Sequence, residues 1–106
     1  MTNSRSKGRR GETSAKRLLL ERDWQVLADT SAGISSCDLV VSDRGGIIYA
    51  VEVKNREVIH PSEFRKQAAK NATGKMRWMV LAKIAGTSSW LVERQAQRPC
   101  VWHERG

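Results

Sequence analysis

The stretch Ile47-Ile48-Tyr49-Ala50-Val51-Glu52-Val53-Lys54 decides the fold of this chain. Its β-branched and aromatic residues predict a strand, in which successive side chains point to opposite faces. One face then carries only apolar side chains, whereas the other face carries Glu52 and Lys54. These two charged groups therefore project together, roughly 7 Å apart along the backbone.

A turn signal, Asp43-Arg44-Gly45-Gly46, joins this strand to an earlier β-branched run, Asp38–Ser42. A three-residue loop places Asp38 opposite Glu52, with Cβ atoms about 5 Å apart. A two-residue loop shifts the register and, without a bulge, turns Glu52 away. Two carboxylates that close repel each other unless a cation lies between them. The three-residue loop thus predicts a Mg²⁺ ion held by oxygen ligands.

The other elements follow from apolar periodicity and turn residues. Apolar residues at helical spacing predict a helix from about Gly11 to Arg22, after a flexible basic arm over residues 1–10. Pro61 suits the first turn of a second helix that ends near Asn71–Gly74. Further strands are expected at Trp24–Ala28, Met76–Ala82, Ser89–Val92 and Cys100–Trp102. This order predicts an α/β fold with a mixed central sheet flanked by helices.

The length of 106 residues suits a single domain, which we place at residues 11–106. No apolar run reaches the roughly 18 residues of a membrane span, and the N-terminus lacks the apolar segment of a secretion signal. We therefore expect a cytoplasmic protein. Cys37 and Cys100 lie far apart in the sequence, which predicts two reduced thiols in or near the core and no zinc site.

The charge balance favours a nucleic-acid partner. The chain has 19 Lys and Arg against 11 Asp and Glu, a net charge of +8. Neutralised phosphates release counterions, so a basic surface binds nucleic acid well. A solvated surface or an acidic protein partner is the alternative. The residues expected to contact DNA are Arg5, Lys7, Arg9, Arg10, Lys16, Arg56, Arg65, Lys66 and Lys70.

Glu12 belongs to the same picture, because it lies on the helical stripe of Ala15 and Leu19 that should face the sheet. A glutamate on the buried side needs a partner, and the predicted metal site would supply one. Taken singly, Glu12 suits a helix start, Asp38 a turn, and Glu52 with Lys54 a surface ion pair. In this order within this frame, they indicate metal-dependent catalysis.

These residues resemble a known family. Gly11-Glu12 on the first helix, then Asp38, then Glu52-Val53-Lys54 look like the motif of the PD-(D/E)xK nuclease superfamily. The resemblance covers about residues 5–92. It is strongest to the archaeal-type Holliday junction resolvases and next to the stand-alone VRR-NUC nucleases. Cys37 departs from the motif, whose name has proline there. The family implies a restriction-endonuclease-like αβββαβ core, Mg²⁺ or Mn²⁺, and hydrolysis of phosphodiester bonds.

The resemblance also assigns roles. The metal ligands that it implies are Glu12, Asp38, Glu52 and the carbonyl of Val53. Lys54 would orient or deprotonate the attacking water, or stabilise charge on the phosphate. Gln67, on the second expected helix, and Ser31, in the loop before the aspartate, match further residues of the catalytic set. Ser35 and Ser36 are rivals for the serine, and ordinary helix-surface or turn roles are the alternatives.

The expected function is a structure-specific endonuclease acting on branched DNA such as Holliday junctions. Nothing resembles a base-reading motif, and backbone contacts fix position without reading sequence. The near two-fold symmetry of a junction suggests a homodimer, with Trp78, Trp90 and Trp102 as candidate interface residues and core packing as the alternative. Two other functions remain open: a nickase, flap or phage-type nuclease of the same superfamily, and a non-catalytic basic DNA-binding module.

Overall fold

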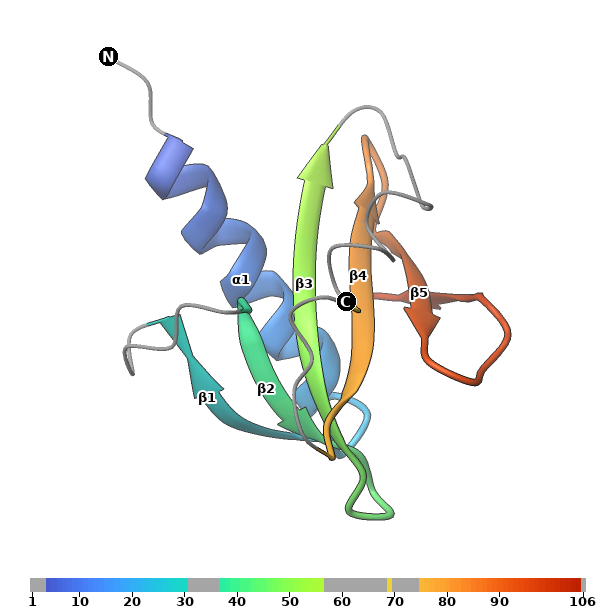
Figure 1. The fold of residues 1–106 in the computed structure, drawn as a ribbon. Helices are drawn as coiled ribbons and strands as arrows, with labels where there is room; N and C mark the ends of the chain where they lie inside the picture. The colour runs from blue at the N-terminus through green and yellow to red at the C-terminus, as the bar shows by residue number, and fades with distance from the viewer. Residues whose placement is uncertain (1–3, 31–36, 57–68, 70–74, 106) are drawn as a thin grey trace.

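The computed structural model describes residues 4–30, 37–56, 69 and 75–105, and at residues 4–10, 55 and 56 it describes the backbone alone. Within these residues the chain forms one helix and a six-stranded mixed sheet (Figure 1). The elements are α1 (Ser4–Leu20), β1 (Gln25–Asp29), β2 (Leu39–Ser42), β3 (Ile48–Arg56), β4 (Arg77–Ile84), β5 (Ser89–Arg94) and β6 (Cys100–His103). The expected α/β class with a mixed sheet is thus confirmed.

The strands follow one another across the sheet in sequence order, from β1 to β6. Neighbouring strands are antiparallel except β3 and β4, which pair in parallel from Tyr49↔Arg77 to Arg56↔Ile84. Parallel neighbours need a crossover connection, usually helical. The second expected helix falls in that connection and, apart from Ala69, lies outside the described residues.

Helix α1 lies against one face of the sheet (Figure 1), where Ala15, Leu18 and Leu19 are fully buried. The expected stripe is therefore confirmed, but the flexible arm over residues 1–10 is wrong from Ser4 onward, because the helix already begins there. Lys and Arg are good helix formers, and a single glycine such as Gly8 costs a helix only about 1 kcal/mol. Among the described residues, no helix has the length and apolar character to cross a bilayer.

The helix ends in a Schellman motif. Asp23 takes a left-handed φ of 63°. The N–H of Trp24 donates to the carbonyl of Leu19 at 3.1 Å, and the N–H of Asp23 donates to Leu20 at 3.1 Å. Trp24 and Leu19 then pack in the same core cluster, the apolar contact that accompanies this motif. The turn thereby delivers the chain directly into β1.

The main core lies between α1 and the helix-covered face of the sheet, where Tyr49, Val51, Met79, Leu81 and Trp90 are buried. Trp90 is 0% exposed, so of the three candidate interface tryptophans it belongs to the core. A smaller cluster lies on the other face around Val80 and Ala82, with Trp78 and Leu91 packed against it.

Both cysteines occupy the core or near-core positions expected of them. Cys37 is buried and its thiol lies 3.3 Å from the carbonyl of Leu39. Cys100 opens β6 and packs, partly buried, against the main core.

Candidate functional site

The site begins with the turn of the β2–β3 hairpin, which sets the register of both strands. Asp43 donates its N–H to the carbonyl of Ile47 at 2.9 Å, which leaves a three-residue loop over 44–46. The Asp43 carboxylate accepts the N–H groups of Gly45 and Ile47, both at 2.9 Å. Gly46 supplies the positive φ of 88° that such a loop needs. Of the two loop lengths that the sequence leaves open, the structure has the three-residue loop on which the predicted site depends.

The register that follows is the expected one as far as Leu39, which pairs with Val51. One residue earlier the ladder departs from it, since the N–H of Asp38 donates to the carbonyl of Val51 at 3.0 Å. The Asp38 carboxylate then accepts the N–H of Val53 through Oδ2 at 2.7 Å. A side-chain oxygen thus takes the place of the next backbone carbonyl. It brings Asp38 to the residue between Glu52 and Lys54.

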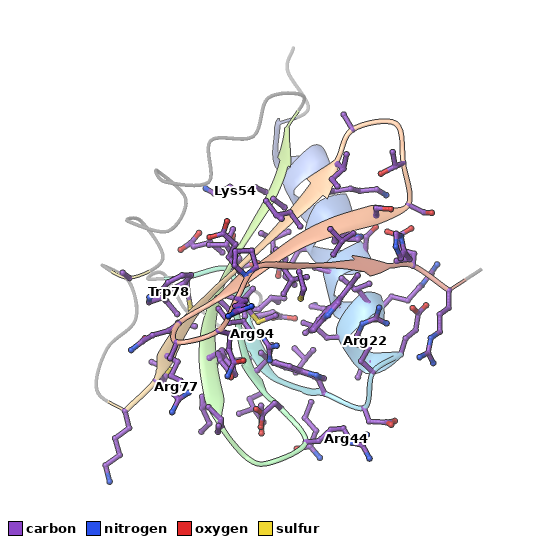
Figure 2. All side chains as sticks on the ribbon, turned by 90° about the vertical axis from the view of Figure 1, so that its right-hand side faces the viewer. Arg22, Arg44, Lys54, Arg77, Trp78 and Arg94 are labelled. Atoms are coloured by element: carbon purple, nitrogen blue, oxygen red, sulfur yellow. The ribbon has the colours of Figure 1, made fainter. Side chains whose placement is uncertain are left out.

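Glu52 and Lys54 lie on the face of β3 opposite α1, which we call the carboxylate face. Their neighbours Val51 and Val53 pack into the helix-side core, so alternation directs the charged pair away from it. Figure 2 shows Lys54 and Trp78 on this side of the sheet. Glu52 is only 4% exposed. A carboxylate that deeply buried must be paired, hydrogen-bonded or metal-bound, because burying an uncompensated charge is costly.

Glu12 takes a different position from the one expected. Its carboxylate accepts the hydroxyl of Thr30 at 3.0 and 3.1 Å and the Thr30 N–H at 3.4 Å. Thr30 directly follows β1, whose last residue, Asp29, pairs with Leu39. Glu12 therefore lies at the same end of the sheet as Asp38, but it comes from the helix on the opposite face to Glu52.

Among the described residues, no three His, Cys, Asp or Glu side chains converge closely enough to hold a metal ion. The expected ligands are therefore brought together in part: Asp38 reaches the strand of Glu52, whereas Glu12 is held by Thr30. Comparisons of the chain with protein-family models, curated proteins and solved structures find no match.

The donors nevertheless suit a hard cation. The carboxylates of Asp38 and Glu52 and the carbonyl of Val53 are all oxygen donors at adjacent positions of the hairpin. Mg²⁺ is usually held by one or two carboxylates, with water and substrate phosphate completing its shell, rather than by an all-protein cage. The buried Glu52, at 4% exposure, supplies the localised negative charge that such an ion requires. These residues fit Mg²⁺ or Mn²⁺.

Several expected site residues fall in parts of the chain that the structure does not describe. Ser31, its rivals Ser35 and Ser36, Gln67, Arg65, Lys66 and Lys70 lie outside the described residues. The backbones of Arg5, Lys7, Arg9 and Arg10 lie on α1 and that of Arg56 ends β3, but their side chains are outside the description. Lys16, expected to contact DNA, forms an ion pair with Asp29.

Sequence reasoning missed Glu93, which is only 6% exposed. Val80 pairs with Glu52 on one side and with Glu93 on the other, so both glutamates lie on the carboxylate face. The signal was available: Leu91 and Glu93 alternate with the buried residues Trp90 and Val92. A second buried glutamate of the same size offers a matched control for Glu52.

Proposed function

We propose that this chain is a metal-dependent, structure-specific endodeoxyribonuclease that cleaves branched DNA, with a restriction-endonuclease-like core. The observation that carries the proposal is the 2.7 Å bond from the Val53 N–H to Asp38, between Glu52 and Lys54. It brings an aspartate, just before β2, next to the glutamate and the lysine that flank Val53 on β3. The parallel pairing of β3 with β4 and the helix on one face support the same core.

The residues have separable roles. Asp38, Glu52 and the carbonyl of Val53 would hold Mg²⁺ or Mn²⁺, which when bound polarises the scissile phosphate and lowers the pKa of a coordinated water. Lys54 lies on the same face as Glu52, where its ammonium can orient the attacking water or stabilise the negative charge on the phosphate. Glu12, the third ligand that the resemblance implies, lies at the same end of the sheet as Asp38 but on the opposite face to Glu52, so it would have to leave Thr30 and move toward the ion.

The net charge supports DNA binding that does not read sequence. A net charge of +8 favours phosphate contacts, which position DNA without reading bases. A four-way junction offers two nearly equivalent strands, and a homodimer would present one site to each.

The test is cleavage of a labelled four-way junction beside matched flap and plain duplex substrates, with Mg²⁺ or with EDTA. We expect paired, symmetric nicks in the junction that disappear with EDTA. Glu52→Gln and Lys54→Met should each slow cutting about 10²-fold or more. The control is Glu93→Gln, which removes an equally buried carboxylate from the same face and should leave cutting close to the native rate.

Each outcome has a clear meaning. Equal cutting of flap or duplex would replace junction resolution by a broader nuclease or nickase of the same superfamily. Binding without cutting under every divalent metal would contradict catalysis and leave the basic DNA-binding module. One observation favours that module: Asp38 and Glu12 each have a protein partner, Val53 and Thr30, that gives them a structural role.

A further inference from the structure

Most of the described cationic side chains are already engaged. Lys16 and Lys83 form ion pairs with Asp29 and Glu104. Arg22 and Arg94 lie over tryptophan rings, with Arg22 4.8 Å from the centre of Trp102. These contacts hold the cationic groups against the fold, so these groups are less available to bind a polyanion such as DNA.

A second set stands apart from these contacts. On the strands and turns, the cations that take part in no hydrogen bond, ion pair or ring contact of the described structure are Arg44, Lys75, Arg77 and Arg98. Arg44 and Lys75 are exposed, and Arg77 is half-buried. Because no ion pair of the described structure compensates their charge, these side chains are available to a negatively charged partner.

Three of them gather at one end of the sheet, and we call Arg44, Lys75 and Arg77 the basic rim. Arg44 lies in the hairpin loop, which Figure 1 shows at the same end of the sheet as the start of β4. Lys75 precedes β4 and Arg77 opens it, paired with Tyr49 near the start of β3. Figure 2 shows Arg44 and Arg77 on either side of the hairpin.

Acidic residues offset the rim only in part. Asp43 is in the same loop, but its carboxylate is occupied by the N–H groups of Gly45 and Ile47. Asp23 shares a shallow hollow with Arg44, about 370 Å³ in volume. The rim therefore remains positive, and Arg98 adds a further cation in the turn after β5.

Along the strands, the rim lies at a different level from the candidate site. Arg77 pairs with Tyr49 and Val80 pairs with Glu52, which separates the two levels by about 10 Å along the strands. Tyr49 belongs to the helix-side core, so Arg77 leaves the sheet on that face, whereas Glu52 lies on the carboxylate face.

We propose that the basic rim holds the phosphate backbone of a duplex DNA arm at the hairpin end of the sheet, beyond the cleavage site. This inference rests on the proposed function for its choice of DNA as partner. It assigns substrate binding to the opposite end of the sheet from the basic first turns of α1 (Figure 1). The rim contacts backbone rather than bases, so it positions any sequence equally.

The test measures binding without cutting. Fluorescence anisotropy of a labelled duplex and a four-way junction, in EDTA, is followed as a function of salt for the full chain. Replacing the rim by Arg44→Gln, Lys75→Gln and Arg77→Gln together should weaken binding roughly 10- to 100-fold near 0.1 M salt. The slope of log K against log salt should fall by about 2 to 3.

The control is Arg17→Gln, which removes one exposed cation from α1 and should change the slope by less than about 1. Unchanged thermal unfolding of both variants confirms that they fold. A rim variant that binds DNA as the native chain does would overturn the inference, and an acidic protein partner would then fit the rim better. If the native chain never cuts DNA but the rim variant still loses affinity, the nuclease proposal fails and the rim stands.

Discussion

At the scale of single residues, Asp38 combines two tasks that substitutions can separate. Its Oδ2 accepts the N–H of Val53 at 2.7 Å, and the same carboxylate is a proposed metal ligand. Replacement by Asn keeps an oxygen acceptor but removes the charge. Replacement by Ala removes both and leaves an amide without its acceptor.

We therefore expect Asp38→Asn to keep native stability within about 1 kcal/mol and Asp38→Ala to lower the free energy of unfolding by about 1–2 kcal/mol. Both variants should cut DNA at least about 10²-fold more slowly, because metal binding needs the charge. Urea unfolding and junction cleavage measure the two effects. An Asn variant that cuts at the native rate would contradict a ligand role for Asp38.

The residue scale also shows what the sequence could not give. Alternation alone predicts Glu52 and Lys54 on one face, and both lie on the carboxylate face because their neighbours Val51 and Val53 pack into the helix-side core. The bond between Glu12 and Thr30 depends on where the chain emerges from β1, which no local pattern encodes. Asp38 differs for another reason: a short side chain can replace a carbonyl in the ladder, and strand periodicity carries no signal for that exchange.

At the scale of elements, the β2–β3 hairpin decides whether the site exists. Its register follows from turn chemistry, which is local: the sequence predicts the hairpin but allows a two- or a three-residue loop, and the three-residue loop sets the register up to Leu39. The loop conformation depends on Gly46, because its φ of 88° lies in a region where residues with a Cβ are strained. Gly45 has no positive φ, and a Cβ there would meet Asp43 Oδ1 at an ordinary 3.5 Å.

Gly46→Ala should accordingly lower the free energy of unfolding by about 1–2 kcal/mol, since the strain is conformational and no atom lies within 4 Å of the added Cβ. Gly45→Ala is the matched control and should change stability by less than about 0.5 kcal/mol. Chemical denaturation of both variants checks the difference. Equal losses at the two positions would mean that the loop conformation is not set by Gly46.

The helix was harder to predict than the hairpin. Its buried stripe is periodic and was identified, but its first turns are polar and basic, which looks the same in an arm and in a helix. Its end agrees with the prediction of about Arg22, which is the C-cap residue of the Schellman motif, although Asp23 rather than glycine takes the left-handed position. The arrangement of β6 beside β5, with Trp90 opposite Trp102, depends on long-range pairing.

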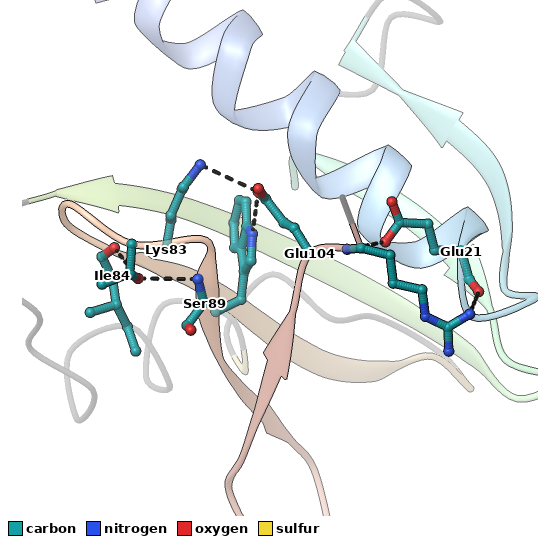
Figure 3. A network of polar contacts seen from close by, with 8 residues as sticks. Glu21, Lys83, Ile84, Ser89 and Glu104 are labelled. Atoms are coloured by element: carbon teal, nitrogen blue, oxygen red, sulfur yellow. Dashed lines mark hydrogen bonds and ion pairs between the residues drawn. The ribbon is translucent and has the colours of Figure 1, made fainter.

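At the scale of the whole molecule, the C-terminal residues join parts of the chain that are far apart in sequence. Arg105 donates its N–H to the Glu21 carboxylate at 3.1 Å and its guanidinium to the Glu21 carbonyl at 3.3 Å. Trp102 contacts Trp24 edge-on, with ring centres 5.6 Å apart. Figure 3 also shows Glu104, which contacts Lys83 on β4 and Trp90 on β5. The last residues thus fasten the end of α1 to the far strands of the sheet.

The contacts of Glu104 make the stability of the fold depend on pH. Its Oε1 accepts the indole N–H of the buried Trp90 at 2.8 Å and lies 3.3 Å from the Lys83 ammonium (Figure 3). The hydrogen bond from Trp90, together with Lys83 and Arg17, lowers the pKa of this carboxyl against the opposing effect of its burial. A carboxyl whose pKa is lowered on folding stabilises the fold above its unfolded pKa, about 4.3 for glutamate.

That stabilisation is lost as the pH falls through the lowered pKa, when the carboxyl takes up a proton in the folded state. We expect the native chain to lose more stability than Glu104→Gln between roughly pH 5 and pH 3. Thermal unfolding followed across this range makes the comparison, and the two curves should converge at acid pH. Glu104→Ala should cost about 1–3 kcal/mol at neutral pH, because it leaves the Trp90 N–H without an acceptor inside the core. Parallel pH profiles for the native chain and the Gln variant would contradict this prediction. They would mean that the negative charge of Glu104 contributes nothing to the stability of the fold.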